Sequence, residues 1–150
     1  MKFPSRQRPD SVLPGTSGAI RVDRRTSTLV RRLKPGDIAV IDHLDLDRAN
    51  AQALLDCGVV AVVNASPFIS GRYPNLGPEL LARAGVVLVD NVGAEAFGTL
   101  HDGAPGRIHE GQLYVKDEPV LTGKQLSLDD ITEMMEEARG GLSTQLQSFT

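Results

Sequence analysis

Three short apolar runs, separated by stretches with helical spacing, constrain the fold of this chain more than any other feature. The runs are Ile38 to Ile41, Val59 to Val63 and Val86 to Val89, and they are rich in β-branched residues. A continuous apolar strand is typical of a parallel sheet that is covered on both faces. Because parallel neighbours are joined by a crossover, usually a helix, the order of elements predicts an α/β domain with a central parallel sheet.

Each connection between these runs carries signals for the start and the stop of a helix. Asp45 is expected to be the N-cap of a helix from Leu46 to Cys57, with Gly58 as its stop, and Pro78 suits the first turn of the next helix. A short strand is expected at Ile20 to Val22. The three helices are predicted between these start and stop residues: Thr26 and Pro35-Gly36, Asp45 and Gly58, Pro78 and Gly85.

The pattern changes in the last third of the chain. The segment from Ile108 to Val115, interrupted by Glu110-Gly111, has the alternation and the turn dipeptide of a β-hairpin. Val120-Leu121 is expected to add a short edge strand. Ser127 with Asp130 resembles a capping box, which predicts that a long helix begins there.

Composition divides the chain into three parts. Residues 1–17 are rich in Pro, Ser, Arg and Gly and have no periodicity, which predicts a flexible leader. Residues 18–125 are expected to form the α/β domain, and residues 126–150 a helix. The helical pattern reaches Thr150 without a stop signal, so we expect it to link to a further C-terminal domain.

The charge of the sequence is unevenly distributed. The net charge is −3, yet residues 1–34 alone carry +7 and the remainder −10. A basic arm suits an acidic partner, a lipid surface or a nucleic acid. No aromatic residues interleave with the arginines and no binding motif occurs, so a nucleic acid is not expected. The simpler interpretation of the arm is a solvated helix face and a loose tail.

The single cysteine and the lack of long apolar runs indicate a cytoplasmic chain. Cys57 is the only cysteine, which excludes an internal disulfide and favours a reducing compartment. We expect a small buried hydrophobic side chain there rather than a nucleophile. The first residues lack the apolar region of a secretory signal, and the longest apolar run is too short to cross a bilayer.

The stretch from Asn64 to Gly77 is the most function-like part of the sequence. It follows a predicted strand and precedes a helix, at the carboxyl end of the sheet, where α/β proteins usually bind ligands. Its hydroxyl, amide and guanidinium groups, with the free backbone N–H groups before the helix, suit a phosphate-bearing ligand. The predicted ligand or partner residues are Asn64, Ser66, Ser70, Arg72, Tyr73, Asn75 and, from the end of the next strand, Asp90.

The same stretch has a second interpretation. Its serine and asparagine side chains would bond the loop's own backbone, and Tyr73 would pack down onto the domain. Neither a P-loop nor a G-x-G-x-x-G pattern occurs in the sequence, so a nucleotide is not specifically indicated.

The acids Asp42, Asp45 and Asp47 raise the question of a metal site. A calcium loop that began at Asp45 would need a glycine near Asn50 and a glutamate near Asp56, and it has neither. The histidines have no second ligand at zinc spacing, and no Ser-His-Asp order or Cys-His pair is defensible. We therefore expect no metal, no cofactor and no catalytic residue.

Several strings in this sequence resemble one known family. From about Gly18 onward the chain is similar to the N-terminal domain of the SteA-like cytokinetic ring proteins of actinobacteria. The strings are Arg21-Val-Asp-Arg24, Lys34-Pro-Gly-Asp-Ile-Ala-Val-Ile-Asp42, Leu44-Asp-Leu-Asp-Arg48, Ala61-Val-Val-Asn-Ala-Ser66 and Ser70-Gly-Arg-Tyr-Pro-Asn-Leu-Gly-Pro78.

That resemblance implies a role in cell division, tied to a small membrane partner (SteB) and to the control of peptidoglycan hydrolysis. Members of the family continue into a domain similar to the catalytic domain of thiamin pyrophosphokinase and then into a membrane-spanning C-terminus. We expect the final helix of this chain to lead toward such a domain.

The order of elements also resembles the swivelling phosphohistidine domain of phosphoenolpyruvate-utilising enzymes. The resemblance implies a layered β/β/α fold with a central, mostly parallel sheet, a C-terminal β-hairpin and a long terminal helix. Those domains carry a phosphorylated histidine in the loop before the second helix, where this sequence has Ser70-Gly71-Arg72. The phosphotransfer chemistry is therefore not expected here, because function is not inherited from fold alone.

Three functions follow as hypotheses. The first is a non-catalytic regulatory domain of a cell-division protein, cytoplasmic and at the division site, with Arg72 and Tyr73 as anchors for a SteB-like membrane partner. The second is an accessory domain of a thiamin pyrophosphokinase-like enzyme that binds a small phosphate-bearing molecule. The third is a structural spacer, and homo-oligomer formation stays open in all of them.

Overall fold

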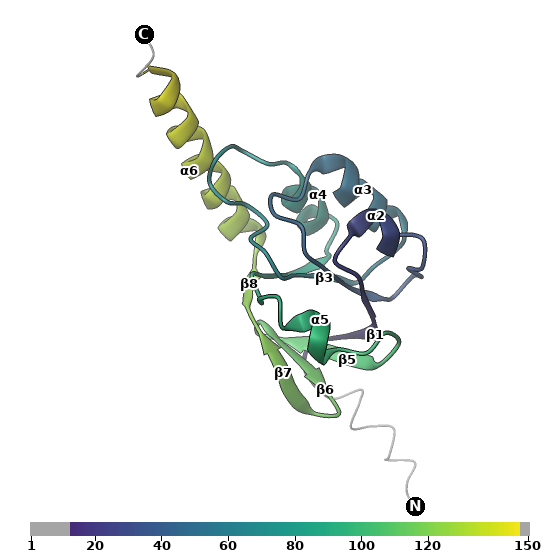
Figure 1. Cartoon of the computed structure of the whole chain (residues 1–150). Helices are drawn as coiled ribbons and strands as arrows, with labels where there is room; N and C mark the ends of the chain where they lie inside the picture. The colour runs from purple at the N-terminus through teal and green to yellow at the C-terminus, as the bar shows by residue number, and fades with distance from the viewer. Residues whose placement is uncertain (1–12, 148–150) are drawn as a thin grey trace, which may run out of the picture.

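The computed structural model describes residues 13–147, with side-chain surroundings for residues 13–140 (Figure 1). Within this part the chain forms one eight-stranded sheet in the order β7-β6-β5-β1-β2-β3-β4-β8. The strands are β1 (Thr16–Val22), β2 (Ile38–Ile41), β3 (Ala61–Asn64), β4 (Val87–Asp90), β5 (Pro105–His109), β6 (Gln112–Val115), β7 (Glu118–Thr122) and β8 (Lys124–Leu126). The helices are α2 (Thr26–Leu29), α3 (Arg48–Asp56), α4 (Gly77–Arg83), α5 (Ala96–Thr99) and α6 (Leu128–Gln147).

The centre of the sheet is parallel and its flanks are antiparallel. Strands β1 to β4 pair in parallel with their neighbours in sequence order. On one side β5, β6 and β7 follow with antiparallel pairing, and on the other side β8 pairs antiparallel with β4. The predicted α/β class is therefore confirmed, with the parallel part confined to the four central strands.

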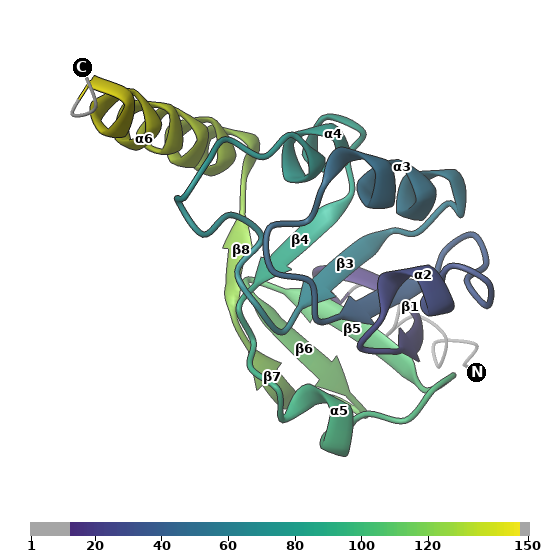
Figure 2. The same cartoon turned by 45° about the horizontal axis from the view of Figure 1, so that its top comes forward.

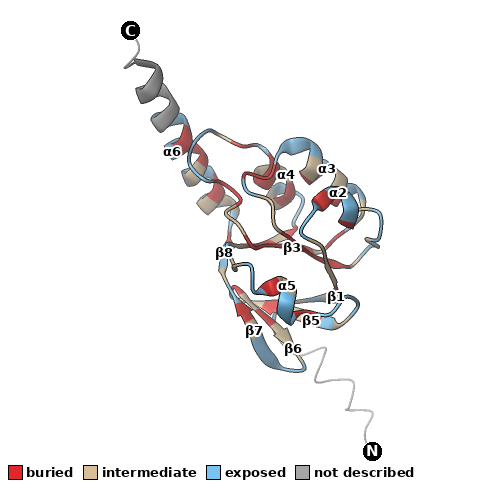
Figure 3. Cartoon of the chain, viewed as in Figure 1, coloured by how far each residue is buried: buried red, intermediate tan, exposed pale blue. Residues whose placement is uncertain are grey.

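Both faces of the parallel strands are buried, which explains their continuous apolar sequences. In β2, Ala39 and Ile41 belong to the core under the helices, whereas Ile38 and Val40 belong to a second core with residues of β5, β6, β7 and α5. Figures 1 and 2 show α2, α3 and α4 on one side of the central strands and the β5–β7 ribbon with α5 on the other. The buried residues concentrate along the central strands between these layers (Figure 3).

Strand β1 connects the two parts of the sheet. Its second half, from Ile20 to Val22, pairs in parallel with β2, and its first half, from Thr16 to Ala19, pairs antiparallel with β5. The predicted strand at Ile20 to Val22 therefore begins earlier, and Thr16 and Ser17, predicted to be in the leader, belong to β1. Residues 1–12 of the predicted leader lie outside the described residues. The first half of β1 is polar and small, and its strand partner lies more than eighty residues further along the chain.

Two predicted helix starts are wrong. The N-cap of α3 is Asp47, whose side chain accepts a hydrogen bond from the Asn50 N–H, whereas Asp45 has a left-handed backbone with φ of 56° and faces another loop. Thr26 is the first residue of α2 rather than its cap, and α2 ends after one turn at Leu29. Helix α4 does carry Pro78 in its first turn, as predicted.

The elements predicted for the last third are confirmed. Strands β5 and β6 form the hairpin around Glu110-Gly111, and β7 is an edge strand. Ser127 and Asp130 form a reciprocal capping box at the start of α6, with hydrogen bonds of 2.9 and 3.0 Å. Strand β8 and the short helix α5 were not predicted.

Close contact between β1 and the loop before β2 generates a first prediction. A Cβ on Gly18 would strike the Gly36 carbonyl oxygen at a distance that real Cβ atoms do not adopt. We expect Gly18→Ala to lower the free energy of unfolding by about 1–3 kcal/mol, because the neighbouring backbone must shift. Urea denaturation measures the change. The control is Gly98→Ala, where a Cβ meets nothing within 4 Å, and equal losses in the two variants would contradict the account.

Candidate functional site

Two loops at the carboxyl edge of the parallel strands form the candidate site. One connects β2 to α3 and comprises residues 42–47, and the other connects β3 to α4 and comprises residues 65–76. We call this pair of loops the double loop (Figure 2). The start of α4, directly after the longer loop, packs closely on the shorter loop, because a Cβ on Gly77 would collide with the backbone oxygens of Leu46 and Asp47.

Asn64 joins the two loops at their base. It is the last residue of β3 and is fully buried. Its Oδ1 accepts hydrogen bonds from the backbone N–H groups of His43 at 2.9 Å and Ser66 at 3.1 Å, and its Nδ2 donates to the His43 carbonyl at 2.8 Å. The side chain therefore completes the backbone hydrogen bonding of both loops.

Aspartates of the first loop bind the serines of the second. The Asp45 carboxylate accepts from the Ser70 N–H at 2.7 Å and from the Ser70 hydroxyl at 2.8 Å, while the Asp45 N–H donates to the Pro67 carbonyl at 3.1 Å. The Ser66 hydroxyl donates to the Asp42 carboxylate. Asp45 is nearly buried, and hydrogen bonds to a carboxylate are stronger than those between neutral groups. This contact therefore fixes the loop conformation.

Phe68 anchors the middle of the longer loop. Its side chain is fully buried. Its N–H donates to the Asp90 carboxylate at 2.8 Å, and its carbonyl accepts from Asn75 Nδ2 at 2.7 Å. Asn75 Oδ1 in turn accepts from the Gly77 N–H at 3.3 Å. Burial raises the pKa of the Asp90 carboxyl above its ordinary value, against the lowering effects of the Phe68 hydrogen bond and of Lys124.

The structure places the predicted site residues on or beside the double loop, where some hold the loop in place and others are exposed to solvent. Five of them engage in hydrogen bonds that hold the double loop in place. Arg72 and Tyr73 instead lie at its tip and are exposed, and Tyr73 retains 46% of its surface. The interpretation of the loop as a self-bonded structure thus holds for the serines and asparagines, and fails for Tyr73, which does not pack down. The five holding residues are Asn64, Ser66, Ser70, Asn75 and Asp90.

Two exposed leucines lie on the same pair of loops and were not predicted. Leu44 and Leu76 are 49% and 46% exposed. Together with Tyr73 they are the exposed large hydrophobic residues of the described chain, and all three lie on the double loop. The sequence did contain a signal for these two residues, because each is an apolar residue in a polar loop and belongs to no predicted strand or helix.

A polar depression of about 350 Å³ is lined in part by the shorter member of the double loop, at residues 42–44. The His43 ring lies in its wall, with Nδ1 2.8 Å from the Thr26 hydroxyl and Nε2 3.3 Å from the Asp47 carboxylate. The Arg24 guanidinium stacks over Phe97 and lies 3.7 Å from Asp42. The lining residues are Arg24, Arg25, Thr26, Ser27, Asp42, His43, Leu44 and Asn50.

The buried polar side chains of the described residues have partners within the chain. Every buried side-chain nitrogen and oxygen among them has a hydrogen-bond partner, and no group of three or more His, Cys, Asp or Glu residues is placed to hold a metal. Asp42, Asp45 and Asp47 each bind a different partner within the chain. Among the helices of the described part, none combines the length and apolar character needed to span a bilayer.

Comparison with known proteins gives no family for this chain. No protein-family model matches the sequence, and no curated protein matches it either.

The half-buried carboxyl of Asp90, at the base of the double loop, generates a second prediction. Because the pKa of Asp90 is raised in the folded state, the folded protein holds this proton more tightly than the unfolded chain does. The stability gained from protonation is complete below the ordinary pKa of 3.8 and is lost as the pH rises through the folded pKa. Asp90→Asn should therefore gain stability relative to the parent between low and neutral pH.

Denaturant titrations of both proteins across that pH range measure the difference, and a carboxyl-carbon NMR titration reads the pKa of Asp90 directly. The asparagine oxygen can still accept from the Phe68 N–H, so the loop contact is kept. An Asp90 pKa at or below 3.8 would contradict the account.

Proposed function

We propose that this chain is a non-catalytic interaction domain and that the double loop is its docking surface. The observation that carries the proposal is that the exposed residues Leu44, Tyr73 and Leu76, with Arg72, all lie on two loops that internal hydrogen bonds hold together. Arginine and tyrosine are enriched among the residues that dominate interface energies. A surface that is ordered before binding loses less conformational entropy when the partner arrives.

The identity of the partner rests on the resemblance to the SteA-like cytokinetic ring proteins. We place this domain in a regulatory role in cell division, in which it contacts a SteB-like membrane partner at the division site and so controls peptidoglycan hydrolysis. The string from Ser70 to Pro78 supports this assignment, because it carries much of the resemblance and runs from the longer member of the double loop into the start of α4.

The finer fold assignment belongs to the same proposal. The helices on one face of the parallel strands and the β5–β7 ribbon on the other support the layered β/β/α arrangement of swivelling-type domains. The position that would carry the phosphorylated histidine lies in the double loop and is occupied by Ser70, Gly71 and Arg72. This supports a binding role in place of phosphotransfer.

Removing the exposed tip side chains tests the proposal. We expect Arg72→Ala and Tyr73→Ala each to weaken binding of the soluble part of the SteB-like partner by about tenfold or more, as hot-spot residues do. Both side chains are exposed and Arg72 makes no ion pair among the described residues, so the melting temperature should stay nearly unchanged. Calorimetric titration measures the affinity and thermal melting measures the stability.

Arg83→Ala is the matched control. Arg83 is also exposed, but it lies at the end of α4, which begins at the double loop and runs to the opposite edge of the sheet. Its loss removes only a surface pair with Glu79, worth about 0.3–0.5 kcal/mol. Unchanged affinity of the tip variants, or an equal loss in the control, would overturn the docking role.

A second candidate function is an accessory domain that binds a phosphate-bearing molecule, as in a thiamin pyrophosphokinase-like enzyme. The depression beside Leu44 favours it, because Arg24 and Arg25 lie in its wall. Thermal shifts with thiamin diphosphate, ATP and phosphoenolpyruvate separate the two functions. A ligand at one hundred times its Kd stabilises the folded state by about 2.7 kcal/mol, and a flat response to all three would count against this candidate.

A further inference from the structure

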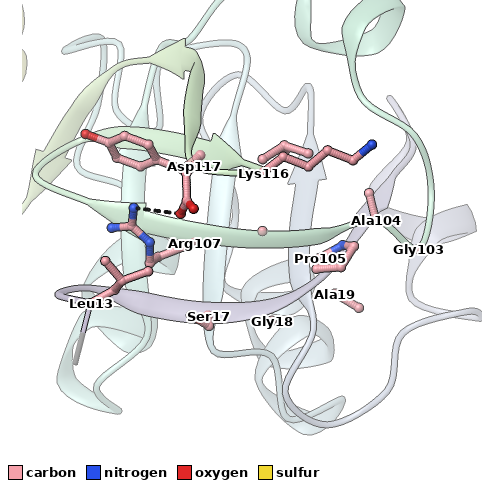
Figure 4. A pocket seen from close by; sticks show the side chains of 13 residues that line it. Leu13, Ser17, Gly18, Ala19, Gly103, Ala104, Pro105, Arg107, Lys116 and Asp117 are labelled. Carbon is pink, nitrogen blue, oxygen red and sulfur yellow. Dashed lines mark ion pairs between the residues drawn. The ribbon is translucent and has the colours of Figure 1, made fainter. Parts of the chain in front are cut away.

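A hollow of about 610 Å³ lies on the outer surface of the β1, β5 and β6 strands and shares no residue with the double loop (Figure 4). Its volume falls in the range of small-molecule sites. The hollow is lined by Leu13, Ser17, Gly18, Ala19, Gly103, Ala104, Pro105, Gly106, Arg107, Tyr114, Val115, Lys116 and Asp117.

The hollow forms because large and small side chains lie next to each other on one face of the sheet. Cross-strand partners share a face, so the pairs Ser17–Arg107, Ala19–Pro105 and Arg107–Tyr114 place these residues on the same side. The other side of these strands is filled by the core. The side chains of Arg107 and Tyr114 project far from the sheet, with the guanidinium stacked 4.3 Å from the centre of the ring. The shorter side chains of Ser17, Ala19 and Pro105 beside them form the floor of the hollow.

Most groups that line the hollow are apolar, or are polar groups that already have a hydrogen-bond partner. Glycine, alanine and proline contribute much of the floor, and the Tyr114 hydroxyl donates to Gln112 Oε1 at 2.7 Å. The Arg107 Nη1 donates to the Pro14 carbonyl at 2.9 Å, which fixes the guanidinium against the ring. A flat apolar body is therefore the shape and polarity that suit the floor.

The charges at the rim favour an anion. Arg107 and Lys116 lie at two ends of the hollow (Figure 4). Asp117 is the single acid of the lining; its exposed carboxylate forms an ion pair with Arg107 at 3.9 Å from Nη2, without a hydrogen bond (Figure 4). Lys116 makes no ion pair with any described residue. The rim thus carries a net positive charge and has guanidinium and ammonium donors available to a ligand.

We propose that this hollow binds a small organic anion with a flat apolar body, at a site independent of the double loop. The apolar part lies on the floor beside the Arg107–Tyr114 stack, and the anionic group reaches the rim cations. The test uses 8-anilinonaphthalene-1-sulfonate, a fluorescent molecule of this kind, with the full 150-residue chain. We expect saturable binding to one site, and we expect 2-naphthoate to displace the dye.

Filling the floor should remove the site. Ala19→Leu places a larger apolar side chain in the hollow, and we expect it to weaken dye binding by about tenfold or more. Ser17→Leu fills the adjacent floor position and serves if Ala19→Leu disturbs folding. Gln52→Leu is the control, because Gln52 is an exposed residue of α3 and its change adds apolar surface elsewhere. We expect the control to bind the dye as the parent does.

A separate variant and a pair of competing ligands test whether the hollow prefers anions. Lys116→Asn removes the rim charge and suits the left-handed backbone there, where φ is 55°. It should weaken dye binding by about threefold to tenfold, and neutral 2-naphthalenemethanol should compete about tenfold less well than 2-naphthoate. The proposal is overturned if dye binding is unsaturable, if neither floor variant reduces it, or if the neutral competitor equals the acid.

Discussion

The hydrogen bonds between Asp45 and Ser70 tie the two members of the double loop together, and the candidate surface depends on them. Asp45 can reach Ser70 because its backbone adopts the left-handed conformation, which aspartate tolerates better than most residues. One carboxylate then binds both the N–H and the hydroxyl of Ser70. The Asn64 amide and the Asp90 carboxylate hold the base of the loop in the same way. The hydrogen bonds of Asp45, Asn64 and Asp90, which lie at or near the ends of neighbouring strands, therefore hold the loop that carries the exposed residues Arg72 and Tyr73.

These hydrogen bonds form at the strand ends because the central strands are covered on both faces. With helices on one side and the β5–β7 ribbon on the other, the strand edges are where polar side chains can gather and stay accessible. Strand β1 makes this arrangement continuous by pairing with β2 through one half and with β5 through the other. Strands β1 and β5 carry Ala19 and Arg107, the small and the large side chains that shape the hollow. One fold therefore displays two separate surfaces with different chemistry.

The sequence predicts the elements that are determined locally and misses those determined by distant partners. The β2 to β4 strands follow from continuous apolar runs, and the α6 start follows from the Ser127–Asp130 pair. Strand β8 and the first half of β1 have no such pattern, because their place comes from pairing with β4 and β5.

The candidate site shows the same division. Its position at the carboxyl edge could be predicted from the order of elements, but the roles of its residues could not. The sequence predicts Asp45 as the cap of α3, but Asp45 binds Ser70, twenty-five residues away, and Asp47 caps the helix instead. Leu44 and Leu76 become part of a surface only once the loops are joined.

The claim that the double loop is ordered before any partner binds is tested most directly by backbone ¹⁵N relaxation of the free protein. We predict order parameters of about 0.85 for residues 66, 68–70 and 75, equal to those of the central strands. Order parameters below about 0.6 at these residues would show a loop that moves freely on the nanosecond timescale. That result would contradict a docking surface held by the Asp45–Ser70 contact.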